Sequence, residues 1–273
     1  MYRPVLLLIV MLVGIGYTTA QDDDMQKMFR KRMEQPGGGT MPVLVQSMAR
    51  TFLGTPYLAQ TLEGNPKEML VCRFDGLDCT TLVENAVALA VAKQKNLDYG
   101  GFQQELTQLR YRNGVIDGYT SRLHYFVDWL HENQKRGLLT DITAKLGGVP
   151  FSKDIHFMSS HPNLYPSLEA EAQWEKVKEI EKEINSRTYT YIPKYSIRQV
   201  EPLLQDGDII GITSTVDGLD CNHQGIITKM GNRAYLLHAS TTAQKVVLSP
   251  QPLAEYVASI KKHSGIIVAR MSE

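Results

Sequence analysis

Three side chains of this sequence have the types that a nucleophilic hydrolase needs: Cys79, His223 and His238. A cysteine nucleophile requires one imidazole to take the thiol proton and a second polar group to orient that imidazole. A histidine by itself is more often an ordinary core or surface residue. The set therefore predicts chemistry of the cysteine-protease type only if the fold brings the three residues together.

Cys79 lies where a glycine-bearing loop is predicted to become a helix. From Thr80 onward, apolar residues recur at intervals of three and four, which is the pattern of a helix packed on a core: Leu82, Val83, Ala86, Val87, Leu89, Ala90 and Val91. Asp78 is a candidate N-cap, and the positive end of the helix dipole favours an anionic sulfur. The alternative is that Cys79 is a small buried residue, since free cysteine is among the most often buried types.

Both histidines fall in a part of the chain with strand patterns. His223 directly precedes a predicted strand over 224–230, His238 ends one over 234–239, and Gly231-Asn232 predicts the hairpin turn between them. Further strands are predicted over 209–214, 245–249 and 265–271, with a short helix over 252–260. Helices followed by a meandering antiparallel sheet predict an α+β fold. The histidines His131, His156, His161 and His263 are interpreted as structural or surface residues, whereas His124 is open to either a substrate-binding or a structural role.

The remaining segments suggest an exported single-domain protein. Residues 1–20 have the layout of a secretory signal peptide with cleavage after Ala20, although an uncleaved anchor is the alternative. We expect a secreted, periplasmic protein with no stable membrane insertion after cleavage. Residues 21–40 pass from charged to Pro/Gly-rich and predict a flexible tether. Residues 41–273 then form one catalytic domain, with an accessory insertion at about 110–195.

Composition and cysteine count exclude several classes of protein. The 29 basic and 29 acidic side chains balance, so nothing indicates a nucleic-acid partner. Cys72, Cys79 and Cys221 are an odd number, so at least one thiol stays free or pairs with another molecule. A redox role with Cys221 as resolving thiol is an alternative, but no CxxC pair is present. No Cys/His cluster has metal-ligand spacing, so neither a metal nor an organic cofactor is expected.

Five short motifs carry a family resemblance. They resemble, in order, those of the NlpC-type papain-fold peptidoglycan hydrolases: Gly54-Thr-Pro-Tyr57, Asp78-Cys79-Thr-Thr-Leu-Val83, Asp206-Gly207-Asp208, His223-Gln-Gly-Ile226 and Leu237-His238-Ala239. The runs GLDCTTLVENAVALA and GYTSRLHYFVDW resemble the N-acetylmuramoyl-L-alanine amidase-like branch. The resemblance implies a helix-borne nucleophile packed on a five- or six-stranded antiparallel sheet. It makes Cys79 the nucleophile, His223 the general base and His238 the orienting residue.

The same resemblance implies that the substrate is an amide in peptidoglycan fragments (muropeptides). Tyr57 and Asp78, beside the cysteine, are candidate substrate-binding residues, as are Arg122 and Tyr125 in the run 118–125. A guanidinium offers a two-donor fork to a stem-peptide carboxylate, although Arg122 is alternatively a structural ion-pair partner. A stem-peptide endopeptidase and a non-catalytic cell-wall-binding module are the rival functions.

Two residues next to the predicted catalytic pair depart from the superfamily pattern. Most members have a small residue after the cysteine and a hydrophobic one after the first histidine, whereas this chain has Thr80 and Gln224. Substrate details of the wider superfamily therefore do not transfer to this chain.

Overall fold

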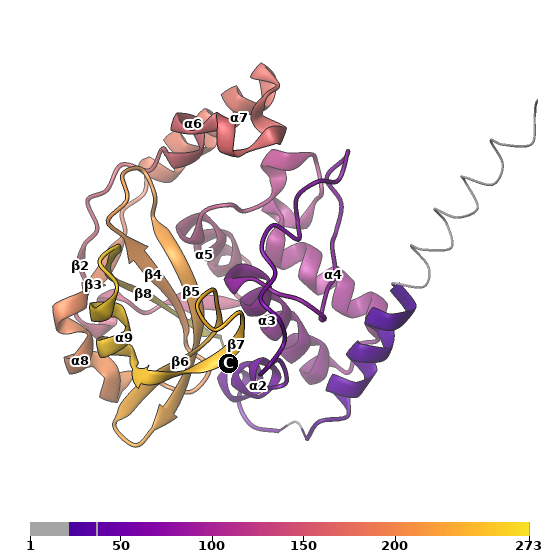
Figure 1. The fold of residues 1–273 in the computed structure, drawn as a ribbon, viewed down its shortest axis with the longest axis vertical. Coiled ribbons are helices and arrows are strands. Elements are labelled where there is room, and N and C mark those ends of the chain that lie inside the picture. The colour runs from indigo at the N-terminus through magenta and orange to yellow at the C-terminus, as the bar shows by residue number, and fades with distance from the viewer. Residues whose placement is uncertain (1–21, 37, 273) are drawn as a thin grey trace, which may run out of the picture.

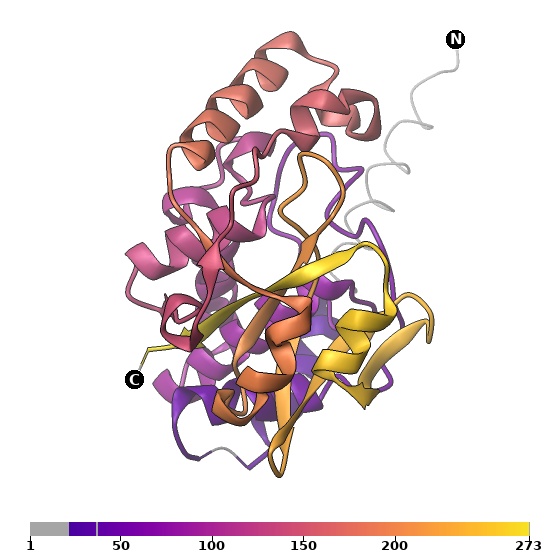
Figure 2. The ribbon, with the colours of Figure 1, turned by 90° about the vertical axis from the view of Figure 1, so that its left-hand side faces the viewer.

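The computed structural model describes residues 22–36 and 38–272, so the predicted signal peptide lies outside the described residues. A central antiparallel sheet is covered on one face by α2 to α5 and on the other by α8 and α9 (Figures 1 and 2). This arrangement confirms the predicted α+β class. No helix among the described residues is long and apolar enough to cross a membrane.

The sheet has eight strands in the described part of the chain, rather than the five or six expected. Their order is β2-β3-β8-β4-β5-β6-β7, and β1 also pairs with β8. The extra strands are short pieces from the middle of the chain that share the free edge of β8, where β3 pairs with 265–266 and β1 with 269–271. The bounds are β1 (Leu139–Asp141), β2 (Val149–Pro150), β3 (Thr190–Pro193), β4 (Ile209–Ser214), β5 (Cys221–Met230), β6 (Arg233–Ser240), β7 (Lys245–Pro252) and β8 (His263–Met271).

Alternation along the strands builds two hydrophobic cores, one on each face of the sheet. Ile209, Ile226 and Leu237 pack with the α2–α5 layer. Their neighbours Ile210, Ile227 and Leu236 pack with α8 and α9. Successive side chains of a strand point to opposite faces, so a central strand covered on both sides is apolar at consecutive positions.

The helix that begins at Cys79 is the most deeply buried element. Every residue of α3 from Thr81 to Ala92 is buried, because α2, α4 and the sheet enclose it. A helix that is buried on all sides belongs to the core. The sequence pattern predicted only one buried face for α3, whereas the structure buries its whole circumference. The helices are α2 (Met41–Arg50), α3 (Cys79–Lys95), α4 (Tyr99–Arg110), α5 (Phe126–Lys135), α6 (Phe157–Ser160), α7 (Glu171–Asn185), α8 (Ile197–Val200) and α9 (Leu253–Ser259).

Two segments differ from the expected organisation. Residues 22–33 of the expected tether form a helix, and its Met25 and Phe29 are buried against the α4 aromatic side chains. Within 110–195, α5 belongs to the core and β1 to β3 join the sheet, so only α6, α7 and their connections stand apart as a lobe (Figure 1). Residues 151–156 form neither helix nor strand and lead into α6.

Candidate active site

Asp78 caps α3 and so makes Cys79 the first residue of the helix. Its backbone is extended, its Oδ1 accepts the Thr81 N–H at 2.8 Å, and the Thr81 hydroxyl accepts the Asp78 N–H at 3.0 Å. This reciprocal capping box satisfies two backbone donors that a helix start leaves free. The predicted N-cap is confirmed, and the cap fixes the direction in which Cys79 leaves the helix.

His223 and His238 lie together, as the hairpin predicted. His223 Nε2 and His238 Nδ1 are 2.7 Å apart, and the two rings meet edge to face at 85°. The β5–β6 register places Ile226 opposite Leu237, so the two histidines form a diagonal pair on one side of the strands. One nitrogen of this contact carries the proton and the other accepts it.

Two further residues, Tyr256 and His263, complete the histidine cluster, and no local sequence pattern predicts either of them. The Tyr256 ring of α9 lies 5.0 Å from the His238 ring and 6.0 Å from that of His263, between ring centroids. His263, at the start of β8, is buried with no hydrogen-bond partner for Nδ1 in the described part of the chain. Only the long-range pairing of β8 with β4 brings His263 here.

The buried imidazoles are neutral at pH 7. Burial, then His238 and His263, lowers the pKa of His223 to about 3, and burial followed by His263 lowers the pKa of His238 to about 4. Each charged imidazole would lose its hydration in this cluster and meet a second positive charge. His223 is therefore a neutral base that can accept a proton.

The Cys79 thiol is also neutral in the resting protein. Burial, then the Asp78 carboxylate, raises its pKa to about 12, although the Gln224 backbone N–H and the Thr80 hydroxyl partly offset this. The helix N-terminus was expected to favour a thiolate, and burial outweighs that effect. None of the three cysteines is in a disulfide.

The two residues that depart from the superfamily pattern are partners of one another. The Gln224 amide Nε2 donates to the Thr80 hydroxyl oxygen at 2.7 Å and so ties β5 to the first turn of α3. These residues directly follow His223 and Cys79 in sequence, so the bond ties the strand that carries His223 to the helix turn that begins with Cys79. The Gln224 side chain turns to α3 while the His223 ring faces Tyr256 of α9, as strand alternation requires.

Tyr57 lies beside the start of α3. Its backbone forms a bridge with Leu77 and donates to the Gln244 carbonyl at 3.0 Å. Burial, then Cys79 and Asp78, raises the pKa of the half-buried Tyr57 phenol. The phenol keeps its proton at neutral pH and can donate a hydrogen bond near the cysteine.

Arg122 and Tyr125, both predicted to bind substrate, are engaged by other side chains inside the protein. The buried Arg122 guanidinium pairs with Glu63 at 2.9 Å and Glu68 at 3.4 Å, which is the structural alternative. The Tyr125 hydroxyl donates to Glu181 at 2.6 Å and accepts the Met158 N–H at 2.8 Å. Tyr125 therefore anchors the α6–α7 lobe.

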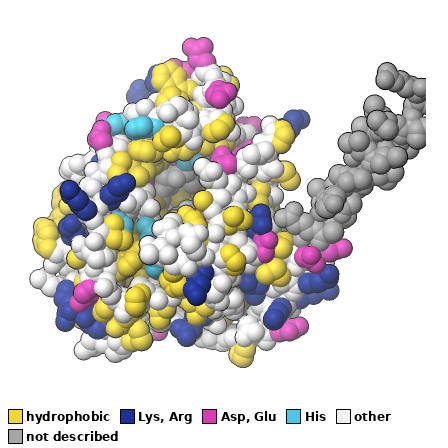
Figure 3. Space-filling view, viewed as in Figure 1, with side chains coloured by type: hydrophobic (Ala, Val, Ile, Leu, Met, Phe, Trp, Pro, Cys, Tyr) yellow, Lys and Arg dark blue, Asp and Glu magenta, His cyan; other side chains and the backbone are white. Residues whose placement is uncertain are grey.

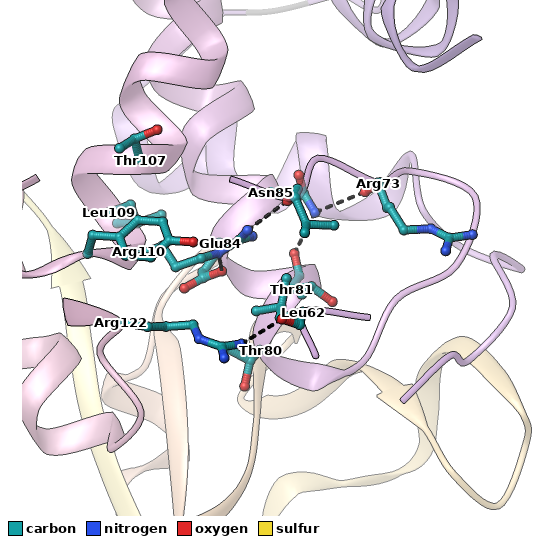
Figure 4. Close-up of polar contacts among 12 residues, drawn as sticks. Leu62, Arg73, Thr80, Thr81, Glu84, Asn85, Thr107, Leu109, Arg110 and Arg122 are labelled. Atoms are coloured by element: carbon teal, nitrogen blue, oxygen red, sulfur yellow. Dashed lines mark hydrogen bonds and ion pairs between the residues drawn. The ribbon is translucent and has the colours of Figure 1, made fainter. Parts of the chain in front are cut away.

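A cleft of 410 Å³ opens next to the capped end of α3, and the protein surface is hollowed on the face shown in Figure 3. Residues from four places in the sequence line it: Asp78 and Thr80 of the cap, Glu63, His124 and the 163–166 segment of the lobe. Arg110 and Arg122 also line the cleft, and Figure 4 shows Arg110 beside Glu84 and Arg122 beside Leu62 and Thr80. The lobe thus supplies one wall of the cleft.

Solved structures with the same fold come from bacterial proteins. An N-acetylmuramoyl-L-alanine amidase from Bacteroides uniformis is 38% identical, with a TM-score of 0.82 over 86% of this chain and 100% of its own. A protein described as a putative xylanase from Bacteroides fragilis is 38% identical, with a TM-score of 0.78 over 82% and 99%. A Legionella pneumophila protein at 22% identity, with a TM-score of 0.72 over 93% and 97%, shares the fold. The comparison with curated proteins gave no match.

The family model described as AmiA-like, N-acetylmuramoyl-L-alanine amidase-like, matches residues 47–266. That span contains the capped cysteine, the histidine pair and the cleft. Together with the structural neighbours, it supports a hydrolase with a peptidoglycan amidase-like function. The chain belongs to the AmiA-like family of N-acetylmuramoyl-L-alanine amidase-like proteins.

Proposed function

We propose that the protein is a cysteine amidase that hydrolyses the amide between N-acetylmuramic acid and L-alanine in muropeptides. The observation that carries the proposal is the His223–His238 pair at 2.7 Å, tied through Gln224 to the helix turn that begins with Cys79. The family description and the Bacteroides uniformis amidase support the same bond. We also assign the fold to the NlpC-type papain group, because a helix-borne cysteine packs on an antiparallel sheet.

In the first step, the protonation of the histidine pair sets the direction of proton transfer. With the proton on His223 Nε2 donated to His238 Nδ1, His223 Nδ1 is unprotonated and accepts the Cys79 thiol proton. The sulfur forms a bond to the lactyl carbonyl carbon, and the carbonyl electron pair moves to oxygen. The Cys79 backbone N–H, free at the helix start, and the Tyr57 hydroxyl are the candidate donors to that oxyanion.

The second half of the reaction returns the protons. The His223 imidazolium gives its proton to the leaving L-alanine nitrogen, the C–N bond breaks, and a muramoyl thioester remains on Cys79. Water then loses a proton to His223 and attacks the thioester, which releases the lactyl carboxylic acid and the thiol. His238 takes no proton in this scheme, because it holds the His223 ring in place and stabilises the imidazolium.

The neutral resting state fits a general-base mechanism. With the pKa of Cys79 near 12 and that of His223 near 3, the thiol and the imidazole are both uncharged before substrate binds. Charge therefore develops only as the sulfur attacks, when the Gln224 backbone N–H and the oxyanion donors are already in position. Preoriented dipoles that act on developing charge are the usual source of rate enhancement in such sites.

The proposal is tested by digesting a defined muropeptide and measuring the masses of the products by mass spectrometry. The expected products are a saccharide ending in a lactyl carboxylate and a stem peptide with a free L-alanine amino group, and Cys79→Ala should remove the activity. A saccharide that still carries L-alanine would identify a stem-peptide endopeptidase instead. Undiminished turnover by Cys79→Ala would contradict the cysteine mechanism.

We further propose that the protein is exported and acts in the periplasm. The signal-peptide pattern of residues 1–20 supports export, and peptidoglycan lies outside the cytoplasmic membrane. Expression with a native N-terminus should yield mature protein that begins at Gln21 in the periplasmic fraction. Full-length protein retained in the cytoplasm would contradict this proposal.

A further inference from the structure

The cleft beside Cys79 is rich in hydrogen-bond acceptors. Asp78 uses Oδ1 for its cap, and no hydrogen bond within residues 22–36 and 38–272 engages its Oδ2. The Glu63 carboxylate, which is about one-third exposed, faces the same space. A ligand that fills this cleft therefore has to bring donors, such as hydroxyl or amide N–H groups.

His124 adds an acceptor whose protonation the structure fixes. Its Nε2 lies 3.0 Å from the Tyr119 carbonyl oxygen, which can only accept, so Nε2 carries the proton. A neutral imidazole then has an unprotonated Nδ1, and burial followed by Arg122 lowers the His124 pKa to about 3, which keeps the ring neutral. The only hydrogen bond of the His124 ring in the described part of the chain is the one from Nε2, so Nδ1 is free, and the half-buried ring lines the cleft.

The arginines near the cleft do not give it a positive charge. Arg110 donates from Nε to Glu84 at 2.7 Å and from Nη1 to the Val71 carbonyl at 2.7 Å. Arg122 is held by Glu63 and Glu68. With Asp78, four carboxylates face two guanidiniums, so the formal charge of this region is negative. Such a site disfavours the free carboxylates of a peptidoglycan stem peptide.

The wall contributed by the α6–α7 lobe suits an uncharged, ring-shaped ligand. Tyr165 presents a half-buried aromatic ring, and Asn163 and Leu164 are exposed at the cleft. Aromatic rings supply broad apolar contact with one polar edge, and an amide offers both a donor and an acceptor. A sugar has matching features, since its ring is apolar on its faces and its edges carry hydroxyl groups.

We propose that this cleft binds the sugar side of the muropeptide, a neutral group rich in hydroxyl and N–H donors, and that His124 Nδ1 accepts one of its hydrogen bonds. This inference rests on the proposed function, because it assigns one side of the scissile amide to one side of Cys79. The stem peptide then leaves on the other side. His124 is a specificity-determining residue in this scheme and takes no part in proton transfer.

Two variants of His124 separate substrate binding from a structural role, in a Cys79→Ala background that cannot turn over. The side-chain amide of glutamine matches Nε2 and can keep the bond to the Tyr119 carbonyl, whereas that of asparagine matches Nδ1 and keeps a polar atom at the cleft. Titration calorimetry with the N-methylamide of N-acetylmuramic acid should show about tenfold weaker binding for His124→Gln, the value of one lost hydrogen bond. His124→Asn should stay within about threefold.

The stem peptide with a free L-alanine terminus is the matched ligand, and its affinity should be unchanged by either variant. An equal loss of affinity for the sugar amide in both variants, or a loss of affinity for the stem peptide alone, would overturn the inference. As a second measurement that needs no substitution of His124, its ¹⁵Nδ1 resonance should shift on addition of the sugar amide and not of the peptide. No sugar binding at millimolar concentration would also overturn it, whereas wild-type turnover of muropeptides tests the proposed function separately.

Discussion

The histidine cluster and a second wall of the cleft, formed by Arg110, Arg122 and their glutamate partners, are both built from polar side chains inside the protein, yet they serve different purposes. In the cluster, neutral His223 and His238 share one hydrogen bond, which leaves the other nitrogen of His223 free for chemistry. In the wall, Arg110 and Arg122 are held by opposite charges on Glu84, Glu63 and Glu68. The two regions therefore differ in charge, because the cluster holds a neutral base whereas the guanidiniums of the wall are neutralised by carboxylates.

The largest expected effect comes from the cluster. His223→Ala should lower kcat/KM by about 10³-fold, because the thiol loses its proton acceptor and general-base catalysis contributes about 10²–10⁴-fold. Steady-state kinetics on a muropeptide measures the change. His156→Ala is the matched control, since His156 bonds only to Ser160 and Asp217 away from the cluster, and it should leave the rate unchanged. A decrease in kcat/KM of less than tenfold in His223→Ala would contradict the catalytic role that separates the histidine cluster from the wall.

Substitutions in the wall should change the stability of the fold rather than the rate of catalysis. Arg110→Met leaves the Glu84 carboxylate buried without a partner, which should lower the free energy of unfolding by about 3–5 kcal/mol. Urea denaturation measures it, and the double variant with Glu84→Met should recover much of the loss, because no unpaired charge then remains. A stable Arg110→Met protein with a raised KM would instead place this arginine on the substrate.

Acid should weaken the cluster selectively. The folded-state pKa values of His223 and His238, near 3 and 4, lie below the ordinary 6.5, so the unfolded chain binds more protons below pH 6.5. Their contribution to stability is complete above pH 6.5 and is lost as the pH falls towards 4, by up to about 1.4 kcal/mol per pH unit for each histidine. Urea denaturation of wild type and His238→Asn between pH 7 and 4.5 should show a shallower loss in the variant; parallel curves would contradict the neutral-cluster account.

The smallest effect is expected at Tyr125, which was predicted to bind substrate. Tyr125→Phe removes the bond to Glu181 and the acceptor for the Met158 N–H, so the free energy of unfolding should fall by about 1–2 kcal/mol. The KM for muropeptide should not change. A several-fold rise in KM with unchanged stability would instead show that Tyr125 contacts the substrate.

The comparison also shows which features the sequence could predict. Asp78 as a cap, Cys79 at the helix start and the Gly231-Asn232 hairpin depend on residues close together in the chain, and all three appear in the structure. The roles of Arg122 and Tyr125 depend on Glu63, Glu68 and Glu181, which lie about 55 to 60 residues away in sequence. His263 reaches Tyr256 only through β8, and no local pattern reports such pairing.

The errors in the predicted fold also arise from contacts between residues that are far apart in the sequence. The strands β1, β2 and β3 are two to four residues long and are defined by the edge of β8 and by each other, so their own sequences carry little periodicity. Residues 22–33 are too charged to indicate a core helix, yet Met25 and Phe29 are enough to bury one face. Burial also reversed the expected ionisation of Cys79, which no helix-dipole argument from sequence includes.

The most direct test of the central claim is the mass of the covalent intermediate. Wild-type protein mixed with a defined muropeptide, quenched in acid during turnover and digested, should yield a peptide containing Cys79 that carries the saccharide and its lactyl acyl group as a thioester. The adduct should be absent when Cys79 is replaced by alanine. An adduct that also contains L-alanine would place the cut within the stem peptide, and an adduct on any other residue would contradict Cys79 as the nucleophile.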